Sequence, residues 1–244
     1  MEPDIFCTVN AGLYIWDGRS GLFVDSLHRG KRLGLSDTPE ELLHGLRQRQ
    51  GIFQMKNDFL FTHKHEDHFD EELVEFCKGE YPASCIYVPE NGGLAERDVE
   101  YLTLGNYRIK SFRAVHDGKR FEKESCWIFL IEAGERKVLV CGDARINEEI
   151  LNRLDRNCRG KIDAVFLNVY QLESGCGKEL LMRIGPDRTF VYHIPFEKDD
   201  GCHYRKIAEK SVEKYQKLIP GLSVARPMSR ISREIWKERP RCFS

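Results

Sequence analysis

Residues 63 to 68 bring together four side chains that commonly bind metal ions. In the stretch FLFTHKHEDHFD, His63, His65, Asp67 and His68 follow a short apolar run. Residues two apart in an extended segment point to the same side, so the two histidines of the HKH pair can share one ion. Asp67 and His68, past a turn, can reach a neighbouring ion. The spacing therefore predicts a site for two metal ions.

Three further residues of the same kind each follow a predicted strand: His116 in AVHDG, Asp143 in CGDA and His193 in YHIPF. A lone histidine on a strand is more often a core or surface residue, but the combined pattern favours one shared site. Imidazole and carboxylate ligands suit zinc and also manganese or iron, so the native metal stays open.

The motif HKHEDH, followed by these later residues in order, resembles the HxHxDH signature of the metallo-β-lactamase superfamily, and the resemblance spans roughly residues 1 to 200. It implies an α/β fold, a four-layer αββα sandwich in which helices flank two mixed β-sheets, with the metal site at one edge. It also implies the ligand sets: His63, His65 and His116 for one ion, Asp67, His68 and His193 for the other, and Asp143 bridging both.

The resemblance further implies a metal-dependent hydrolase. Two divalent ions, with zinc expected first, would hold a bridging hydroxide that cleaves an ester, lactone or phosphoester bond of a small molecule. Asp67 is then also the candidate for relaying a proton. Asp143 and the complete histidine set disfavour a true β-lactamase, and the short segment between His68 and His116 disfavours an inserted nuclease domain. The ascorbate-phosphate lactonase-like branch is the expectation.

Other interpretations stay open. The same fold can carry two irons for redox chemistry, or metals that only brace a non-catalytic module. The basic carboxyl end, RPMSRISREIWKERPRC, could steer RNA to a phosphodiesterase or nuclease site, although a solvated terminal helix is the simpler interpretation. Three residues are weaker candidates for substrate contacts: His28, His203 and Tyr204.

The elements that position these residues follow from apolar periodicity. Strands are predicted in CTVNAGLYIWDGRSGLFVDSL, with a hairpin turn at DGRSG, and in DFLFT, CIYVP, YLTL, YRIKSFRAV, CWIFLIEAGERKVLVCGD, IDAVFLNVY, TFVYH and LSVARP. Helices are predicted in SDTPEELLHGLRQRQ, in DEELVEFCKG closing at Gly79, in NEEILNRL and KELLMRI, and over about residues 204 to 219. The order favours one domain over 1-244 with stacked sheets and outer helices.

Composition narrows the class further. The 38 basic and 39 acidic residues nearly balance, so no global field indicates an obligatory nucleic acid or membrane partner. Nine scattered cysteines without a CxxC pair indicate reduced thiols. No apolar run approaches the roughly 20 residues of a membrane-spanning helix. We therefore expect a soluble, cytoplasmic protein that acts on a small-molecule substrate, with a homo-oligomer left open.

Overall fold

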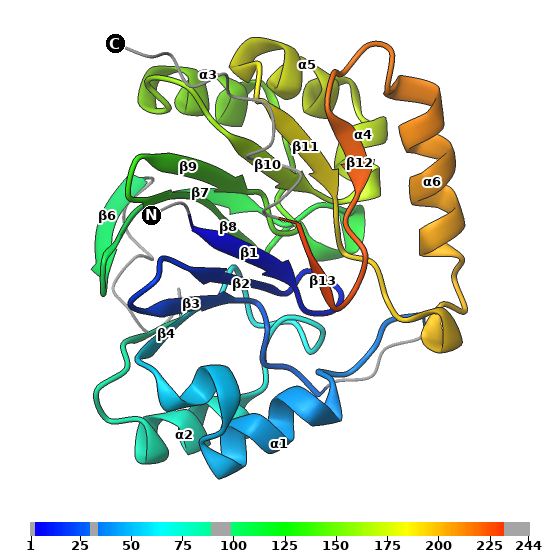
Figure 1. Ribbon diagram of the computed structural model, residues 1–244. Coiled ribbons are helices and arrows are strands. Elements are labelled where there is room, and N and C mark those ends of the chain that lie inside the picture. The colour runs from blue at the N-terminus through cyan, green and yellow to red at the C-terminus, as the bar shows by residue number, and fades with distance from the viewer. Residues whose placement is uncertain (1–2, 30–33, 89–98, 232–244) are drawn as a thin grey trace, which may run out of the picture.

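Two β-sheets lie face to face in the computed structural model, which describes residues 3 to 29, 34 to 88 and 99 to 231 (Figure 1). The first sheet has the strand order β13 (Ser229–Arg230), β1 (Asp4–Cys7), β2 (Leu13–Trp16), β3 (Gly21–Val24), β4 (Asn57–Leu60) and β5 (Ile86–Tyr87). The second has the order β12 (Leu222–Val224), β11 (Arg188–Val191), β10 (Ala164–Leu167), β9 (Arg136–Val140), β8 (Ser125–Ala133), β7 (Tyr107–Val115) and β6 (Val99–Leu104). Both sheets contain antiparallel and parallel pairs.

Helices cover the two outer faces. The first sheet carries α1 (Glu40–Gln48) and α2 (Glu71–Glu80), and the second carries α3 (Glu148–Asn157), α4 (Val169–Glu173), α5 (Gly175–Ile184) and α6 (Tyr204–Tyr215) (Figure 1). Short 3-10 helices span Gly51–Gln54, Lys119–Phe121 and Glu197–Asp199. This arrangement confirms the predicted αββα sandwich.

The central strands are apolar on both faces because each face is covered. In β8, Trp127 and Phe129 point into the layer between the sheets, whereas Ile128 and Leu130 pack with the cluster that includes α3 and α5. Successive side chains of a strand point to opposite faces, so an uninterrupted apolar run is what such a strand requires. These buried strands fix the positions at which the ligand loops begin.

Several predicted element boundaries are wrong. Pro39, which we expected inside the first helix, is its N-cap residue, and no side-chain bond caps α1. Gly79 lies within α2, which ends with Glu80. The predicted strand IDAVFLNVY stops at Leu167, because Asn168 and Gln171 form a capping box that begins α4. α6 ends at Tyr215 rather than near residue 219.

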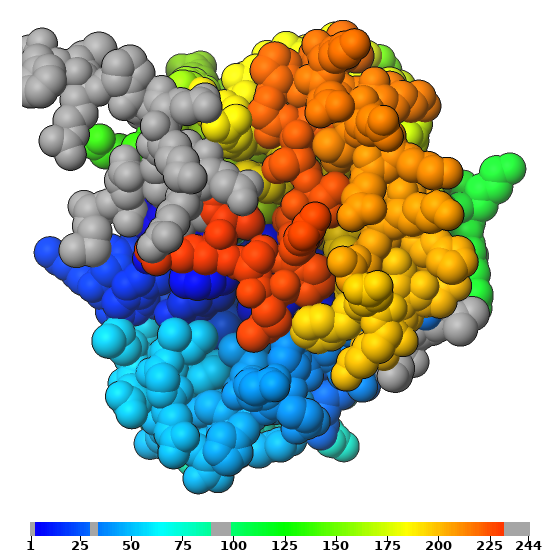
Figure 2. All heavy atoms as spheres, turned by 45° about the vertical axis from the view of Figure 1, so that its right-hand side comes forward, coloured from blue at the N-terminus to red at the C-terminus, as the bar shows by residue number. Residues whose placement is uncertain are grey.

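The carboxyl end also differs from the expectation. Ser229 and Arg230, predicted within a basic terminal helix, form β13, which pairs antiparallel with β1. In Figure 2 the last described residues accordingly lie against the amino-terminal strands. Residues 226 to 231 of the basic stretch contain no helix, and its residues 232 to 242 lie outside the described part of the chain. Within the described ranges, no helix is both long enough and apolar enough to cross a bilayer.

Candidate metal centre

All seven predicted ligands lie just beyond the carboxyl ends of buried strands. His63, His65, Asp67 and His68 follow β4 of the first sheet. His116, Asp143 and His193 follow β7, β9 and β11 of the second sheet. The structure therefore brings side chains from both sheets together at one edge of the sandwich.

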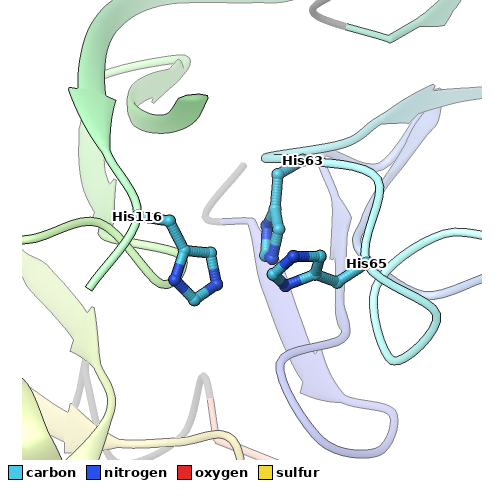
Figure 3. A group of neighbouring side chains, drawn as sticks. All are labelled: His63, His65 and His116. Atoms are coloured by element: carbon cyan, nitrogen blue, oxygen red, sulfur yellow. The ribbon is translucent and has the colours of Figure 1, made fainter. Parts of the chain in front are cut away.

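His63, His65 and His116 form the first ligand group. One ring nitrogen of each lies within 4.8 Å of the others. The ring centroids are 4.5 Å apart for His63 and His65, 4.9 Å for His63 and His116, and 4.5 Å for His65 and His116. Figure 3 shows the three rings turned toward one another, two from the loop after β4 and one from the end of β7. A single ion between the rings would be reached by all three.

The hydrogen bonds of this group leave suitable nitrogens for an ion. His63 Nδ1 is 3.0 Å from Thr62 Oγ1, and its buried Nε2 has no hydrogen-bond partner. His116 Nδ1 is 2.6 Å from the Asp117 carbonyl oxygen, and its Nε2 is likewise buried without a hydrogen bond. A buried polar atom without a partner costs about 1–3 kcal/mol. These two nitrogens therefore fit a bound metal ion.

Protonation favours the same interpretation. Burial, and then the positive charge of His68, hold the pKa of His63 well below its usual value. The neutral imidazole that results is the form that binds metal. The remaining member, His65, contacts the carboxylate of Glu124 through Nε2.

Asp67, His68, Asp143 and His193 form the second ligand group, with ligand atoms again within 4.8 Å of one another. His193 Nε2 lies 3.2 Å from Asp67 Oδ2. Asp143 Oδ2 lies 3.4 Å from His68 Nε2, and 3.6 Å from Nε2 of His116 in the first group. Asp143 thus stands between the two groups, at the position that a bridging carboxylate would occupy.

Opposite charges determine the electrostatics of the second group. Burial alone would lower the pKa of His68, but the carboxylates of Asp25, Asp143 and Asp67 raise it well above its usual value. Burial alone would raise the pKa of Asp143, but His193 and His68 lower it well below the usual value. Protons on the histidines balance the carboxylates when no ion is bound, so ion binding should release protons.

Asp25 supports the second ligand group through its contact with His68, a role that its place in the sequence does not predict. Its fully buried carboxylate accepts hydrogen bonds from the Thr62 backbone N–H at 2.7 Å and the Thr62 hydroxyl at 2.6 Å. The same carboxylate lies 2.9 Å from His68 Nδ1. A carboxylate on the outer nitrogen fixes the tautomer and the orientation of a ligand histidine. Asp25 therefore leaves His68 Nε2 facing the site.

Asn168 supports Asp143 in a similar way. Its side-chain N–H donates to Asp143 Oδ1 at 3.0 Å, so Oδ2 is the oxygen nearest the histidines. Asn168 is also the N-cap residue of α4. One turn of chain therefore both starts the helix and orients the carboxylate.

A cavity of about 420 Å³ opens beside the ligands. Its described lining combines five ligand residues with other side chains and one glycine: Leu35, His65, Asp67, His116, Asp117, Gly118, Phe121, Asp143, Asn168, Val169, Tyr170, His193 and Tyr204. The sequence gives no signal that Leu35, Phe121 and Val169 line a cavity, because a single apolar residue here resembles an ordinary core residue. The volume suits a small molecule.

The three weaker candidates for substrate contacts fare differently. Tyr204 lines the cavity. His28 is completely buried and is absent from the lining. His203 is exposed, in the left-handed conformation that precedes α6, and is also absent from the lining. The placement of His28 and His203 therefore does not support a substrate contact.

No protein-family model matches the sequence, and no curated protein matches it. Solved structures do match. A possible metal-dependent hydrolase from Veillonella parvula DSM 2008 superposes with a TM-score of 0.64 and 12% identity, covering 95% of this chain and 100% of that chain. The metallo-β-lactamase fold protein YhfI from Bacillus subtilis gives a TM-score of 0.58 and 12% identity, covering 94% and 99%.

CmlA, a diiron β-hydroxylase from Streptomyces venezuelae, is a third match. It gives a TM-score of 0.59 and 16% identity, covering 94% of this chain and 53% of that chain. A variant of the CmlA β-hydroxylase gives a TM-score of 0.65 and 17% identity, covering 94% of this chain and 54% of that chain. This chain thus spans about half the length of CmlA. At such identities the likeness concerns the fold.

Proposed function

Because this chain has the metallo-β-lactamase fold, we propose that it is a metal-dependent hydrolase that cleaves an ester, lactone or phosphoester bond of a small molecule. The observation that carries the proposal is the pair of ligand groups that meet at Asp143 on the wall of an open cavity. Structural likeness to a possible metal-dependent hydrolase agrees with it.

The ligand types fit two divalent ions, as do the buried Nε2 atoms of His63 and His116, which make no hydrogen bond. His63, His65 and His116 would hold one, Asp67, His68 and His193 the other, and Asp143 would reach both. Imidazole and carboxylate ligands without a thiolate suit zinc, manganese or iron. When bound, such ions lower the pKa of water toward about 7 and polarise the bond under attack.

Asp67 would act on the attacking water. Burial alone would raise its pKa, but His68 and His193 hold it below the usual value, so the carboxylate stays ionised. It lines the cavity and lies 3.2 Å from His193 Nε2. An ionised carboxylate in this position can accept a hydrogen bond from the water and orient it, and can take up its proton in passing.

Water is a better candidate nucleophile than the nearest thiol. Cys126 Sγ lies 3.7 Å from His63 Nδ1 but is completely buried. Burial, reinforced by the negative charges of Asp143 and Asp25, holds the pKa of this thiol well above its usual value. The thiolate is the reactive form of cysteine, so Cys126 is suited to packing rather than to catalysis.

Elemental analysis of the purified protein, paired with a panel of ester, lactone and phosphodiester substrates, tests the proposal. We expect about two ions per chain, with both ions and turnover reduced in His65→Ala and Asp143→Asn. His44→Ala, which removes an exposed histidine on α1, is the matched control and should keep both properties. A fully metallated protein that turns over no substrate, or a preparation that binds no metal, would contradict the proposal.

Diiron oxidation is the second candidate, favoured by the likeness to CmlA. It predicts two irons per chain, a coloured protein, and oxygen consumption that depends on an added reductant. Zinc-loaded protein would be inactive in that case. Comparing the zinc-loaded and iron-loaded forms on the same substrates therefore separates hydrolysis from oxidation.

A further inference from the structure

The cavity beside the ligand groups has an aromatic and aliphatic wall. Phe121, Tyr170 and Tyr204 contribute aromatic rings, and Leu35 and Val169 contribute aliphatic side chains. Apart from the ligand residues and the two tyrosine hydroxyls, its polar side chains are Asp117 and Asn168. Among the lining residues in the described ranges, none is lysine or arginine. The wall therefore offers contact area to an uncharged group.

Phe121 lies against the first ligand group. Its ring centroid is 4.9 Å from that of His65 and 4.7 Å from that of His116. The 3-10 helix Lys119–Phe121 holds it there, with the Phe121 N–H donating to the Gly118 carbonyl oxygen at 3.0 Å. A substrate whose reacting bond lies over the ligands would place a neighbouring group beside this ring.

Tyr170 and Tyr204 contribute a second aromatic surface. The two rings meet edge to face at 90°, with centroids 6.3 Å apart. Tyr170 remains 56% exposed, although it lies in the first turn of α4, two residues after the Asn168 cap. Because Asn168 also donates to Asp143, one short turn connects Tyr170 to the carboxylate that lies between the two ligand groups.

Charge at the rim of the cavity agrees with the apolar wall. Arg145 lies 3.6 Å from the carboxylate of Asp117 and 3.6 Å from that of Glu122, so its charge is shared between two acids. Within the described cavity lining, a substrate anion far from the metal ions would therefore meet the carboxylate of Asp117. The nearby Arg120 guanidinium lies outside that lining, 5.8 Å from the centre of the Phe121 ring. Substrates whose distal group is neutral avoid that repulsion.

We propose that Phe121, Tyr170 and Tyr204 select substrates in which a neutral aromatic or planar apolar group adjoins the bond to be cleaved, such as aryl esters and aromatic lactones. The identity of the bond rests on the proposed hydrolase function. The preference for a neutral ring concerns binding, so it can be measured without turnover. Each aromatic contact should contribute a factor of about 3 to 10 in affinity.

Hydroxamates provide the probe, because their chelating group binds a metal ion while their substituent varies. We would titrate the zinc-loaded protein with acetohydroxamate, benzohydroxamate and 4-carboxybenzohydroxamate by calorimetry. Benzohydroxamate should bind at least about tenfold more tightly than acetohydroxamate, and the added carboxylate should weaken binding. Tyr170→Ala and Phe121→Leu should each lower the advantage of benzohydroxamate about 3- to 10-fold, leaving acetohydroxamate unchanged.

Two further variants sharpen the test. Tyr170→Phe keeps the ring and should keep the preference, whereas Tyr101→Ala removes an exposed tyrosine from β6, outside the cavity lining, and should change nothing. Equal affinities for acetohydroxamate and benzohydroxamate, or tighter binding of the carboxylated probe, would overturn the inference. The expected binding pattern without any ester, lactone or phosphoester hydrolysis would instead overturn the hydrolase proposal alone. Binding of no hydroxamate at all would overturn the inference, whereas the hydrolase proposal is tested separately by metal content and turnover of the substrate panel.

Discussion

At the scale of single residues, the ligands could be predicted and their supports could not. His63, His65, Asp67 and His68 are adjacent in the sequence and follow an apolar strand, so type and spacing identify them. Asp25 lies 37 residues before its partner Thr62 and carries no local signal beyond its place after a strand. Contacts between distant segments depend on how β3 and β4 pair, which periodicity does not specify.

The position of Asp25 leads to a prediction about metal affinity. Asp25→Asn keeps the size of the side chain but removes the negative charge beside His68 Nδ1. We expect the affinity for the second ion to fall about 10- to 100-fold, while the first group keeps its ion. Competition with a chromogenic chelator, at fixed pH, measures both affinities.

Asp58 offers the matched control for that experiment. It is also a completely buried aspartate, but its Oδ1 accepts from the Cys85 backbone N–H at 2.7 Å, away from the ligand groups. Asp58→Asn should change the free energy of unfolding without changing the affinity for the second ion. Equal losses of affinity in the two variants would mean that the effect comes from general destabilisation.

At the scale of elements, the apolar runs predicted the strands well, and capping determined where the predictions were wrong. Pro39 is the N-cap of α1 rather than an early helical residue, and Gly79 lies within α2 rather than closing it. The contacts of the neighbouring residues determine these helix ends. The apolar pattern predicts Asn168 as part of a strand, yet its side chain caps α4 and donates a hydrogen bond to Asp143. Such a residue caps a helix and also hydrogen-bonds a ligand side chain. The conformational preference of the residue type alone predicts neither role.

The turn between β9 and Asp143 leads to a prediction about stability. Gly142 has φ of 53°, and a Cβ at this position would lie 2.9 Å from Thr62 Cβ. Gly142→Ala should therefore introduce both backbone strain and a clash with Thr62, the residue that donates hydrogen bonds to Asp25. We expect a loss of about 2–4 kcal/mol in the free energy of unfolding, measured by urea denaturation.

Gly134, in the turn between β8 and β9, isolates the backbone contribution. Its φ is 62°, and no heavy atom lies within 4 Å of a Cβ added there. Gly134→Ala should cost only the strain of the left-handed conformation, about 1 kcal/mol. If both variants lose the same free energy, the contact with Thr62 contributes nothing.

At the scale of the whole molecule, the sandwich was predicted because HKHEDH resembles a known signature, and periodicity alone would not have given it. Apolar periodicity indicates which strands are buried but not which sheet each one joins. The seven-stranded sheet begins with β6, whereas the six-stranded sheet takes its last strand, β13, from the far end of the described chain. Strand order of this kind depends on pairing between segments that are remote in sequence.

The distribution of the ligands over both sheets leads to a prediction about metal removal. β4 belongs to one sheet, and β7, β9 and β11 belong to the other, so bound ions would join the two. An ion present at 100 times its dissociation constant should add about 2.7 kcal/mol to the free energy of unfolding. We expect EDTA to lower the melting temperature of the unaltered protein, as scanning calorimetry would record.

The same measurement on His65→Ala supplies the control. This variant lacks one ligand of the first group, so EDTA should lower its melting temperature by less. His44→Ala should respond like the unaltered protein. A melting temperature insensitive to EDTA in protein shown to contain metal would mean that the ions do not link the sheets energetically.

The pairing of β13 with β1 has a consequence for biosynthesis. Arg230 Nε donates to the carboxylate of Asp4 at 3.0 Å, so contacts at this edge join residues 226 positions apart. During translation, the amino-terminal strands leave the ribosome long before their partner exists, while His193, the last predicted ligand, emerges earlier than β13. The predicted ligands can therefore come together on a nascent chain whose first sheet still has an open edge. Until β13 emerges, β1 is available to chaperones or to mispairing.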